Sequence, residues 1–330
     1  MIKIKFTTII ALGAAVSLIS SCATTKGVEN TQTSTIETIE SESTEKVKKE
    51  PKPISVQNTS NQQEKQFKEL VDTLELKVTG KPKAVYAKNA FNTAYTVTVT
   101  GENGPAEGIS ITVSYPSSRT NDTVSFSNIQ LTTDAEGKIT FKPETPSFAV
   151  KSEVTFYPTP VSSNSTVVQA AYNTAVKAPY IVKSSYVTYP YGILYVYDYN
   201  ENGKPTTNNF TLLQNLRNSG VSVGNSPISD LSFMNRPVSE LYKANYNIVG
   251  NSYNFLVAGS FKYTEPAVET ESEATVKMAA DLTCIDMKTG EVIYKTVIEH
   301  SATEKNKWTA EQKCRKVLAE KATEALIYGM

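Results

Sequence analysis

The feature that most constrains the fold of this chain is a repeated alternation of apolar and polar residues between positions 95 and 157. Two runs carry it most clearly, Tyr95-Thr-Val-Thr-Val-Thr100 and Ile109-Ser-Ile-Thr-Val-Ser-Tyr115. A period of two is typical of antiparallel strands that bury one face. Further strands are expected over residues 123–131, 138–142 and 153–157. Short strands at this spacing predict a β-sandwich, and residues 67–160 are its expected extent.

Two stretches of this region resemble bacterial immunoglobulin-like (Ig-like) domains. They are Asn103-Gly-Pro-Ala-Glu-Gly-Ile-Ser-Ile111 and Leu131-Thr-Thr-Asp-Ala-Glu-Gly-Lys-Ile-Thr-Phe141. The resemblance implies an all-β Ig-like sandwich in which the second stretch is a hairpin. It implies no particular ligand, because such sandwiches serve mainly as spacers or adhesive modules.

A second domain is expected after a Ser-, Asn- and Ala-rich connector over residues 161–183. Gly192-Ile-Leu-Tyr-Val-Tyr-Asp198 and Asn254-Phe-Leu-Val-Ala-Gly-Ser-Phe261 are apolar on both faces, as strands covered on both sides are. Helices are expected over 209–219, 237–248 and 309–327, with a hairpin around Met287-Lys-Thr-Gly290. The order β-α-β-α-β-β-β-α predicts an α/β domain over residues 184–330, a mixed sheet with packed helices.

This second region resembles the periplasmic module of the curli-secretion lipoprotein and the N-terminal part of the Tol-system propeller protein. Phe255-Leu-Val-Ala-Gly259 and Cys284-Ile-Asp-Met-Lys-Thr-Gly-Glu-Val-Ile293 carry the resemblance, although Asn254 stands where such families commonly have Asp. Curli-type pores also need an insert of amphipathic strands. The connection 262–273 is short, charged and not alternating, so the resemblance implies the soluble module without the channel.

The first 22 residues have the plan of a bacterial secretory signal, with Lys3 and Lys5 before an apolar run from Phe6 to Ile19. The ending Ile19-Ser-Ser-Cys22 resembles a lipobox, in which Cys22 is acylated and becomes the mature N-terminus. The alternatives are ordinary cleavable secretion and a membrane span. A span needs about 18 or more apolar residues, and this run is shorter.

The lipobox resemblance implies a diacylglycerol and an amide-linked acyl chain on Cys22, and lipid there would attach the protein to a membrane. In the sorting rule of some Gram-negative bacteria, Asp after the cysteine retains a lipoprotein at the inner membrane. Ala23 stands there, which favours the outer membrane. Residues 23–66 are polar with few large apolar residues, and they predict a disordered tether. A short amphipathic helix over residues 64–76 is expected to lead into the first domain.

Composition excludes several classes of function. The chain has 33 basic and 33 acidic residues, so it lacks the positive field expected for nucleic-acid binding. One histidine, His300, excludes His-pair metal sites, and a surface position is favoured for it over a catalytic one. Asp198-Tyr-Asn-Glu-Asn-Gly203 matches half of a calcium loop, but Asn209 replaces the bidentate Glu, so a turn is favoured. No metal, cofactor or small-molecule substrate is predicted.

Two further cysteines, Cys284 and Cys314, are expected to face the same core, one from a strand and one from the last helix. In an exported protein they could form a disulfide. The alternative is that both are small buried hydrophobic residues.

Together these patterns predict a non-enzymatic, lipid-anchored envelope lipoprotein. Its folded part would present an interaction module to envelope proteins in the periplasm or at the cell surface. The alternative is a surface adhesin or glycan-binding lipoprotein. Its binding face would be formed by the aromatic rings of Tyr172, Tyr180, Tyr186, Tyr189 and Tyr191.

Overall fold

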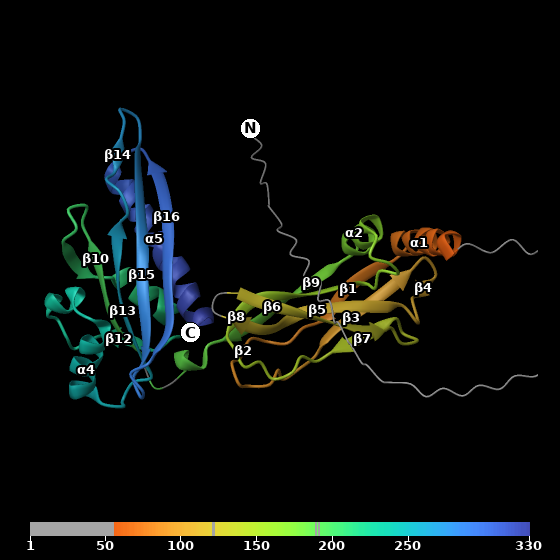
Figure 1. Ribbon diagram of the computed structural model, residues 1–330, viewed down its shortest axis with the longest axis horizontal. Helices are drawn as coiled ribbons and strands as arrows, with labels where there is room; N and C mark the ends of the chain where they lie inside the picture. The colour runs from red at the N-terminus through yellow and green to blue at the C-terminus, as the bar shows by residue number, and fades with distance from the viewer. Residues whose placement is uncertain (1–55, 121–122, 189, 191) are drawn as a thin grey trace, which may run out of the picture. The chain divides into compact units, whose positions relative to one another are not determined.

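The structure, a computed structural model, describes residues 56–120, 123–188, 190 and 192–330. The described residues belong to one compact unit, Ile54–Met330 (Figure 1). The predicted signal segment with its acylation site Cys22, and residues 23–55 of the predicted tether, lie outside the described residues.

The first half of the described chain forms two β-sheets that share one core. The four-stranded sheet contains β1 (Glu75–Gly80), β3 (Tyr95–Gly101), β4 (Gly104–Pro105) and β7 (Lys138–Phe141). The five-stranded sheet has the order β2 (Val85–Tyr86), β9 (Val176–Lys183), β8 (Val150–Pro158), β5 (Ser110–Thr120), β6 (Thr123–Thr132). The predicted alternation is the cause: along β3, Tyr95, Val97 and Val99 are buried, and they share a core with Ile111 and Val113 of β5.

The turn between β6 and β7 is confirmed, but the hairpin implied by the Ig-like resemblance is wrong. β6 pairs with β5, whereas β7 pairs with β3 in the other sheet. Asp134 closes the turn by accepting hydrogen bonds from the backbone N–H of Glu136 (3.1 Å) and Lys138 (2.7 Å). The carbonyl oxygen of Gly137 then accepts a hydrogen bond from the N–H of Val99 at 2.7 Å. The chain therefore crosses at this turn from the five-stranded sheet to the four-stranded sheet, where β7 pairs with β3.

The five-stranded sheet ends later than the predicted boundary near residue 160. The expected connector 161–183 contains α2 (Ser165–Asn173) and β9, and β9 pairs with β8 along the sheet. The phenol of Tyr95 donates to the carbonyl oxygen of Pro179 at 2.8 Å, which joins the two sheets across the core.

The helix before the first strand is longer than predicted. α1 spans Val56–Asp72, so residues 56–66 are helical and not part of an unstructured tether. Phe67 and Val71 pack with Val167 and Ala171 of α2 in a small core of their own. Glu64 accepts hydrogen bonds from Ser162 (2.7 Å) and Asn164 (2.9 Å). These contacts to a distant segment stabilise a helix whose polar first turns gave little sequence signal.

The second half of the described chain forms a mixed seven-stranded sheet. Its strands are β10 (Gly192–Tyr199), β11 (Pro205–Asn208), β12 (Val223–Asn225), β13 (Phe255–Tyr263), β14 (Val268–Glu269), β15 (Ala274–Asp286) and β16 (Val292–Glu304). β10 pairs parallel with β12 on one side and with β13 on the other. β15 pairs antiparallel with β13 and with β16. The predicted order of strands and helices is confirmed, with β11 and β14 as short additions.

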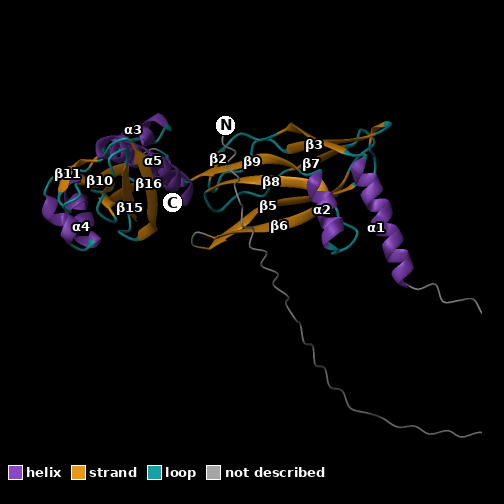
Figure 2. Cartoon of the chain, turned by 90° about the horizontal axis from the view of Figure 1, so that it is seen from above, coloured by secondary structure: helices purple, strands orange, loops and turns teal. Residues whose placement is uncertain are grey.

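Helices cover both faces of this sheet (Figures 1 and 2). α3 (Phe210–Asn218) and α5 (Lys307–Gly329) share one core with Leu194 and Val196 of β10. α4 (Val238–Val249) packs with Ile193 and Tyr195 on the opposite face, next to the 3-10 helix η2 (Leu231–Asn235). Because successive side chains of β10 point to opposite faces, a strand that is apolar throughout needs both layers.

The end of α5 contacts the five-stranded sheet and the segment that follows it. The carbonyl oxygen of Ile327 accepts a hydrogen bond from the N–H of Ser184 at 2.8 Å. That of Tyr328 accepts one from Arg119 Nη1 at 2.8 Å, and Arg119 also donates to the carbonyl oxygen of Ala149 at 3.1 Å. A cation at the carboxyl end of a helix also opposes the partial negative charge there.

Candidate functional site

The carboxyl end of β10 is the expected place for a site in this type of sheet. In open α/β sheets, ligands bind beyond the carboxyl ends of parallel strands, where successive connections leave on opposite faces. β10 and β13 are parallel neighbours, and the helices that follow β10 and β12 lie on opposite faces. Four polar side chains meet there, which we call the carboxyl-end cluster: Asp198, Asn209, Glu311 and Arg315.

Asp198 is the one carboxylate of β10, and Asn209 and Arg315 compensate its negative charge. Its Oδ1 accepts a hydrogen bond from Asn209 Nδ2 at 2.8 Å and lies 2.8 Å from Arg315 Nη1. Asn209 also caps α3, because its Oδ1 accepts from the N–H of Leu212 at 2.7 Å. One amide thus ties the first turn of α3 to the end of β10.

Arg315 extends the cluster from α5. Its Nη2 donates to the carbonyl oxygen of Tyr199 and to Glu311 Oε1, each at 2.7 Å. The side chains of Arg315 and Asp198 are only 13% and 18% exposed. Burial raises the pKa of the Asp198 carboxyl, and the Arg315 charge and the Asn209 hydrogen bond partly offset this.

This arrangement ties three elements together. One guanidinium faces two carboxylates, and one oxygen of each carboxylate, Asp198 Oδ1 and Glu311 Oε1, is engaged by neighbours in the protein. The carboxyl-end cluster therefore holds α3 and α5 against β10.

A polar groove of about 490 Å³ lies beside the cluster. Hydroxyl and amide side chains supply much of its lining, including Asn200, Thr206, Thr207, Thr211 and Gln312. Two exposed aromatic residues lie close in the chain to residues that line it. Phe210 (66% exposed) directly precedes Thr211, and Trp308 (68% exposed) lies one helical turn before Gln312.

The loop that resembled half of a calcium site is a turn between β10 and β11. Asn200 Oδ1 accepts a hydrogen bond from the N–H of Lys204 at 3.0 Å, so it closes the turn. Glu201 accepts from the N–H of Ala267 at 2.7 Å and pairs with Lys307. Across the described ranges, no group of three or more His, Cys, Asp or Glu could hold a metal ion.

Cys284 and Cys314 face the same core, as predicted, but they are free in the structure. Cys314 Sγ donates to the carbonyl oxygen of His300 at 3.3 Å, and His300 pairs with Met278 of β15. Cys284 lies six residues beyond Met278 on that strand, which is about 20 Å at 3.4 Å per residue. A disulfide needs Cα atoms roughly 4.4–6.8 Å apart, so the disulfide considered from the sequence is not formed in this arrangement. Burial raises the pKa of both thiols, that of Cys314 to about 11, so both are protonated at neutral pH.

The tyrosines considered as an adhesive face do not form one surface among the described residues. Tyr180 is buried in the core between the first two sheets. Tyr186 donates to Asp286 Oδ2 at 2.9 Å, and Tyr172 is exposed on α2 and stacks on Tyr157. Tyr189 and Tyr191 lie outside the described residues. His300 is half-buried on β16, and its carbonyl oxygen bonds Cys314.

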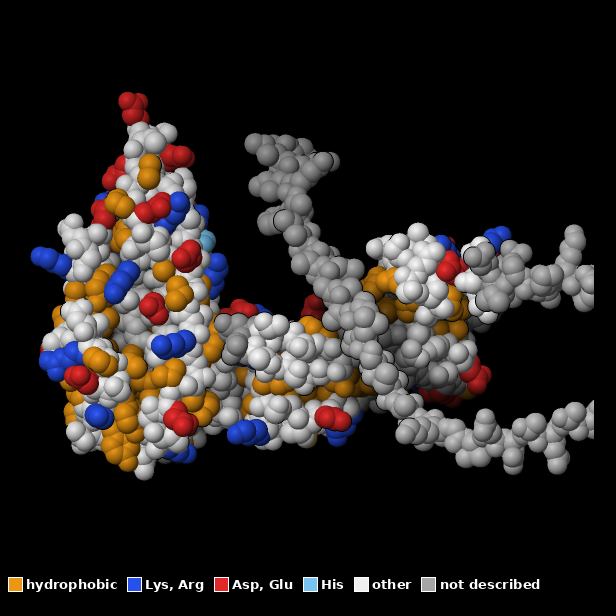
Figure 3. Space-filling view, in the orientation of Figure 1, with side chains coloured by type: hydrophobic (Ala, Val, Ile, Leu, Met, Phe, Trp, Pro, Cys, Tyr) orange, Lys and Arg blue, Asp and Glu red, His pale blue; other side chains and the backbone are white. Residues whose placement is uncertain are grey.

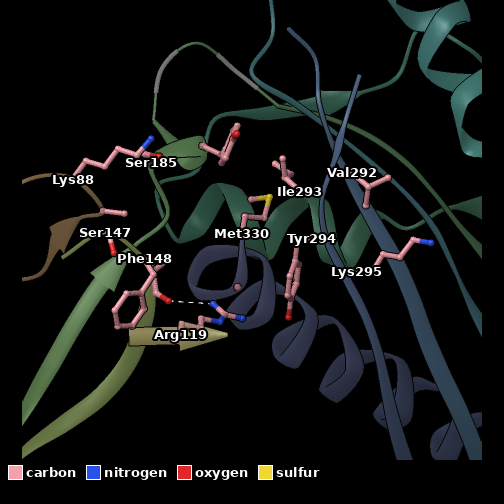
Figure 4. Close-up of a pocket in the computed structure, with 14 residues that line it drawn as sticks. Lys88, Arg119, Ser147, Phe148, Ser185, Val292, Ile293, Tyr294, Lys295 and Met330 are labelled. Atoms are coloured by element: carbon pink, nitrogen blue, oxygen red, sulfur yellow. Dashed lines mark hydrogen bonds between the residues drawn. The ribbon is translucent and has the colours of Figure 1, made fainter. Parts of the chain in front are cut away.

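A second cavity lies where β2, β5, β16 and the end of α5 approach one another. It measures about 620 Å³, and Figure 4 shows the side chains around it. Arg119 lies at its base, where the guanidinium is 5.8 Å from the centre of the Tyr294 ring. Lys88 reaches it from the turn after β2.

Sequence reasoning missed most of these residues because they are far apart in the chain. Glu311 and Arg315 were within reach, since they stand at i and i+4 on a predicted helix and are oppositely charged. Nothing local links them to Asp198, more than a hundred residues earlier. Lys88 has no sequence signal at all.

One family model matches the chain. Residues 191–327 match the TP0693-like lipoprotein, C-terminal domain, and this segment contains the seven-stranded sheet and α3 to α5. The segment is therefore similar to a lipoprotein domain. Among proteins with curated descriptions, none matches the sequence significantly.

Several solved bacterial structures are similar over about two fifths of this chain. Lipoprotein GNA1162 from Neisseria meningitidis is 16% identical over 40% of this chain and 99% of that chain, with a TM-score of 0.24. The PelC dodecamer from Paraburkholderia phytofirmans is 14% identical over 39% and 81%, with a TM-score of 0.25. A minor lipoprotein from Acinetobacter baumannii is 10% identical over 42% and 92%, with a TM-score of 0.23. The finer resemblance to the curli and Tol proteins stays a prediction.

Proposed function

We propose that the chain is a lipid-anchored cell-envelope lipoprotein whose folded part is a non-enzymatic interaction module for envelope proteins. The observation that carries the proposal is the match of residues 191–327 to a lipoprotein family model. The signal segment and its terminal Cys22 agree with it independently. Within the described helices, none combines the length and apolarity needed to cross a membrane.

The anchor is proposed to be lipid on Cys22, with the outer membrane as its location because Ala23 follows it. Multiple acyl chains give stable attachment, whereas one chain binds only marginally. The two sheets over residues 75–183 are proposed to be an Ig-like spacer, and the α/β part beyond it the module that binds.

The polar groove beside the carboxyl-end cluster is the proposed binding face. Phe210 and Trp308 are exposed and lie close in the chain to its lining residues. Val268 (58% exposed) adjoins Glu269, whose Oε1 lies 3.8 Å from Nζ of Lys307, the residue before Trp308. Exposed aromatic residues are enriched in protein–protein interfaces, where they often act as anchors. Figure 3 shows hydrophobic side chains interspersed with charges of both signs on the visible face, which suits a protein partner.

Fractionation tests the anchor. The wild-type protein should sediment with membranes, and Cys22→Ala should be released to the soluble fraction or remain as unprocessed precursor. Ala23→Ser, which keeps the cysteine, should behave as wild type. Retention of mature, processed Cys22→Ala on membranes would refute lipid anchoring.

Crosslinking in whole cells tests the binding face. Trp308→Ala should reduce crosslinks to envelope proteins, because it removes the largest exposed anchor without touching the core. Val297→Ala, an exposed residue on β16, is the matched control. Equal crosslinking of both variants would remove the groove from the proposal.

A further inference from the structure

Lys88 occupies a backbone position that normally belongs to glycine. The N–H of Asn89 bonds the carbonyl oxygen of Tyr86 at 3.0 Å, which makes residues 86–89 a β-turn with Lys88 third. Its φ is +70°, and among the described residues no other non-glycine has a positive φ. A type II turn requires this conformation at its third position, and glycine or asparagine is the usual residue there.

The turn is held from both sides, so the strain at Lys88 is retained. The N–H of Ala87 donates to the carbonyl oxygen of Lys183 at 2.8 Å, and that of Lys88 donates to Pro146 at 2.7 Å. Strained positions of this kind persist where the surroundings over-determine them, and they often mark ligand contacts. Because the backbone conformation at position 88 favours glycine, the reason that lysine stands there is to be sought in its side chain.

That side chain lines the cavity of about 620 Å³. The volume is within the range of small-molecule sites, roughly 300–1,000 Å³. In Figure 4, Lys88 extends along one side toward Ser185, with Ser147 nearby, while Arg119 and Tyr294 lie across the cavity. Lys295 also lines it, but its ammonium points away.

The charged side chains of this lining are all of one sign. Three of its described side chains are cationic, and none is Asp or Glu. The two serine hydroxyls can donate hydrogen bonds, and the aromatic walls can contact an apolar body. Arg119 is held by its bonds to the carbonyl oxygens of Ala149 and Tyr328, so it forms part of the cavity wall, whereas Lys88 is exposed.

We propose that the cavity beside Lys88 binds a small acidic molecule, whose carboxylate or phosphate group contacts the Lys88 ammonium and the hydroxyls of Ser147 and Ser185. A positive, partly enclosed surface attracts anions, and charge-assisted hydrogen bonds hold them. This site is separate from the groove at the carboxyl end of β10, and its occupancy does not depend on the lipid anchor.

Calorimetric titration of the purified full chain in detergent tests the site. Inorganic phosphate and benzene-1,3,5-tricarboxylate, in separate titrations, distinguish a phosphate from a carboxylate ligand. We expect saturable binding of one of them that weakens as salt is added. If neither anion binds saturably at concentrations up to about 10 mM, the proposal is overturned. A dissociation constant of that size corresponds to a binding free energy of roughly −3 kcal/mol.

Variants at position 88 separate binding from folding. Lys88→Gly should weaken anion binding by about tenfold or more, the equivalent of one charged contact, and Lys88→Arg should retain it. Lys88→Gly should also raise the thermal midpoint, because glycine accepts the positive φ without strain. Lys83→Ala, an exposed lysine outside the cavity, should bind as wild type. Undiminished binding by Lys88→Gly would overturn the assignment.

Discussion

Arg315 is the one cation of the carboxyl-end cluster, so its removal is expected to have a large effect on stability. It joins the carboxylates of Asp198 and Glu311 and the carbonyl oxygen of Tyr199. No other hydrogen-bond partner of its Nη1 is present in the described part of the chain. Removing one member of a buried ion pair leaves an uncompensated charge, which costs more than the pair itself contributes.

Arg315→Met should therefore lower the free energy of unfolding by about 3 kcal/mol. Methionine fills similar space, so the loss reports on the charge and not on packing. Urea denaturation measures it, with Lys316→Met, an exposed neighbour on α5, as the control within about 0.5 kcal/mol of wild type. If the two variants were equally stable, the cluster would not hold α3 and α5 as described.

At the scale of elements, the turn between β6 and β7 decides how the first two sheets are connected. Gly137 has a φ of +68°, and a Cβ there would collide with the carbonyl oxygen of Val99 and lie 2.9 Å from the nitrogen of Ala106. Both are backbone atoms of the neighbouring hairpin, so neither can move aside cheaply.

Gly137→Ala should cost more than about 3 kcal/mol of unfolding free energy, because steric collision adds to strain. Gly203 is the matched control: its φ is +69°, and nothing lies within 4 Å of a Cβ there. Gly203→Ala should cost only about 1 kcal/mol, the strain term alone. Thermal or urea unfolding measures both. Equal losses would mean that close approach at the crossing does not constrain the fold.

Local patterns predicted the elements well, and they failed where pairing partners are distant. The period-two runs, the apolar runs and the helical spacings located most of the long strands and α3 to α5, because each signal lies within one element, but they missed β1 and β9. The sequence around Gly137 predicted a turn but not that β7 would pair with β3, since that choice is made by residues of another strand. Residues 56–66 are helical, and Glu64 among them accepts hydrogen bonds from Ser162 and Asn164, about a hundred positions away.

The candidate sites show the same limit more strongly. The loop starting at Asp198 was recognised as polar, yet the partners of Asp198 are Asn209 and Arg315. Local sequence does not predict the conformation of Lys88, because a positive φ at lysine is set by its neighbours' hydrogen bonds and not by its own preference.

At the scale of the whole molecule, both halves bury tyrosine phenols, and this predicts sensitivity to alkali. Burial raises the pKa of Tyr180 and of Tyr195 to about 12, and it raises that of Tyr95 further. The unfolded chain releases these protons near pH 10. The stabilisation from protonated phenols is therefore complete at neutral pH and is lost as the pH rises from about 10 through 12.

Tyrosinate absorbance and circular dichroism, followed together from pH 9 to 12.5, should change in a single step because the buried phenols ionise when the protein unfolds. Tyr180→Phe should make the loss of stability over this range shallower, by on the order of 2 kcal/mol at its upper end. Ionisation of all phenols near pH 10 with unchanged circular dichroism would contradict the two tyrosine-containing cores.

The function proposed for the whole molecule depends on the N-terminus. Residues 191–327 match a lipoprotein family model, whereas the proposed attachment to a membrane depends on one side chain, Cys22. Without that lipid, the proposed account has nothing that would hold the two sheets over residues 75–183 or the polar groove at an envelope surface.

The most direct measurement is mass spectrometry of the N-terminal tryptic peptide from the membrane-extracted protein. Cleavage after Lys26 releases Cys22-Ala-Thr-Thr-Lys26. The account predicts that this peptide begins at Cys22 and carries a diacylglycerol on sulfur and an acyl chain on the amino group. A mature N-terminus at any other residue, or an unmodified Cys22 thiol, would contradict it.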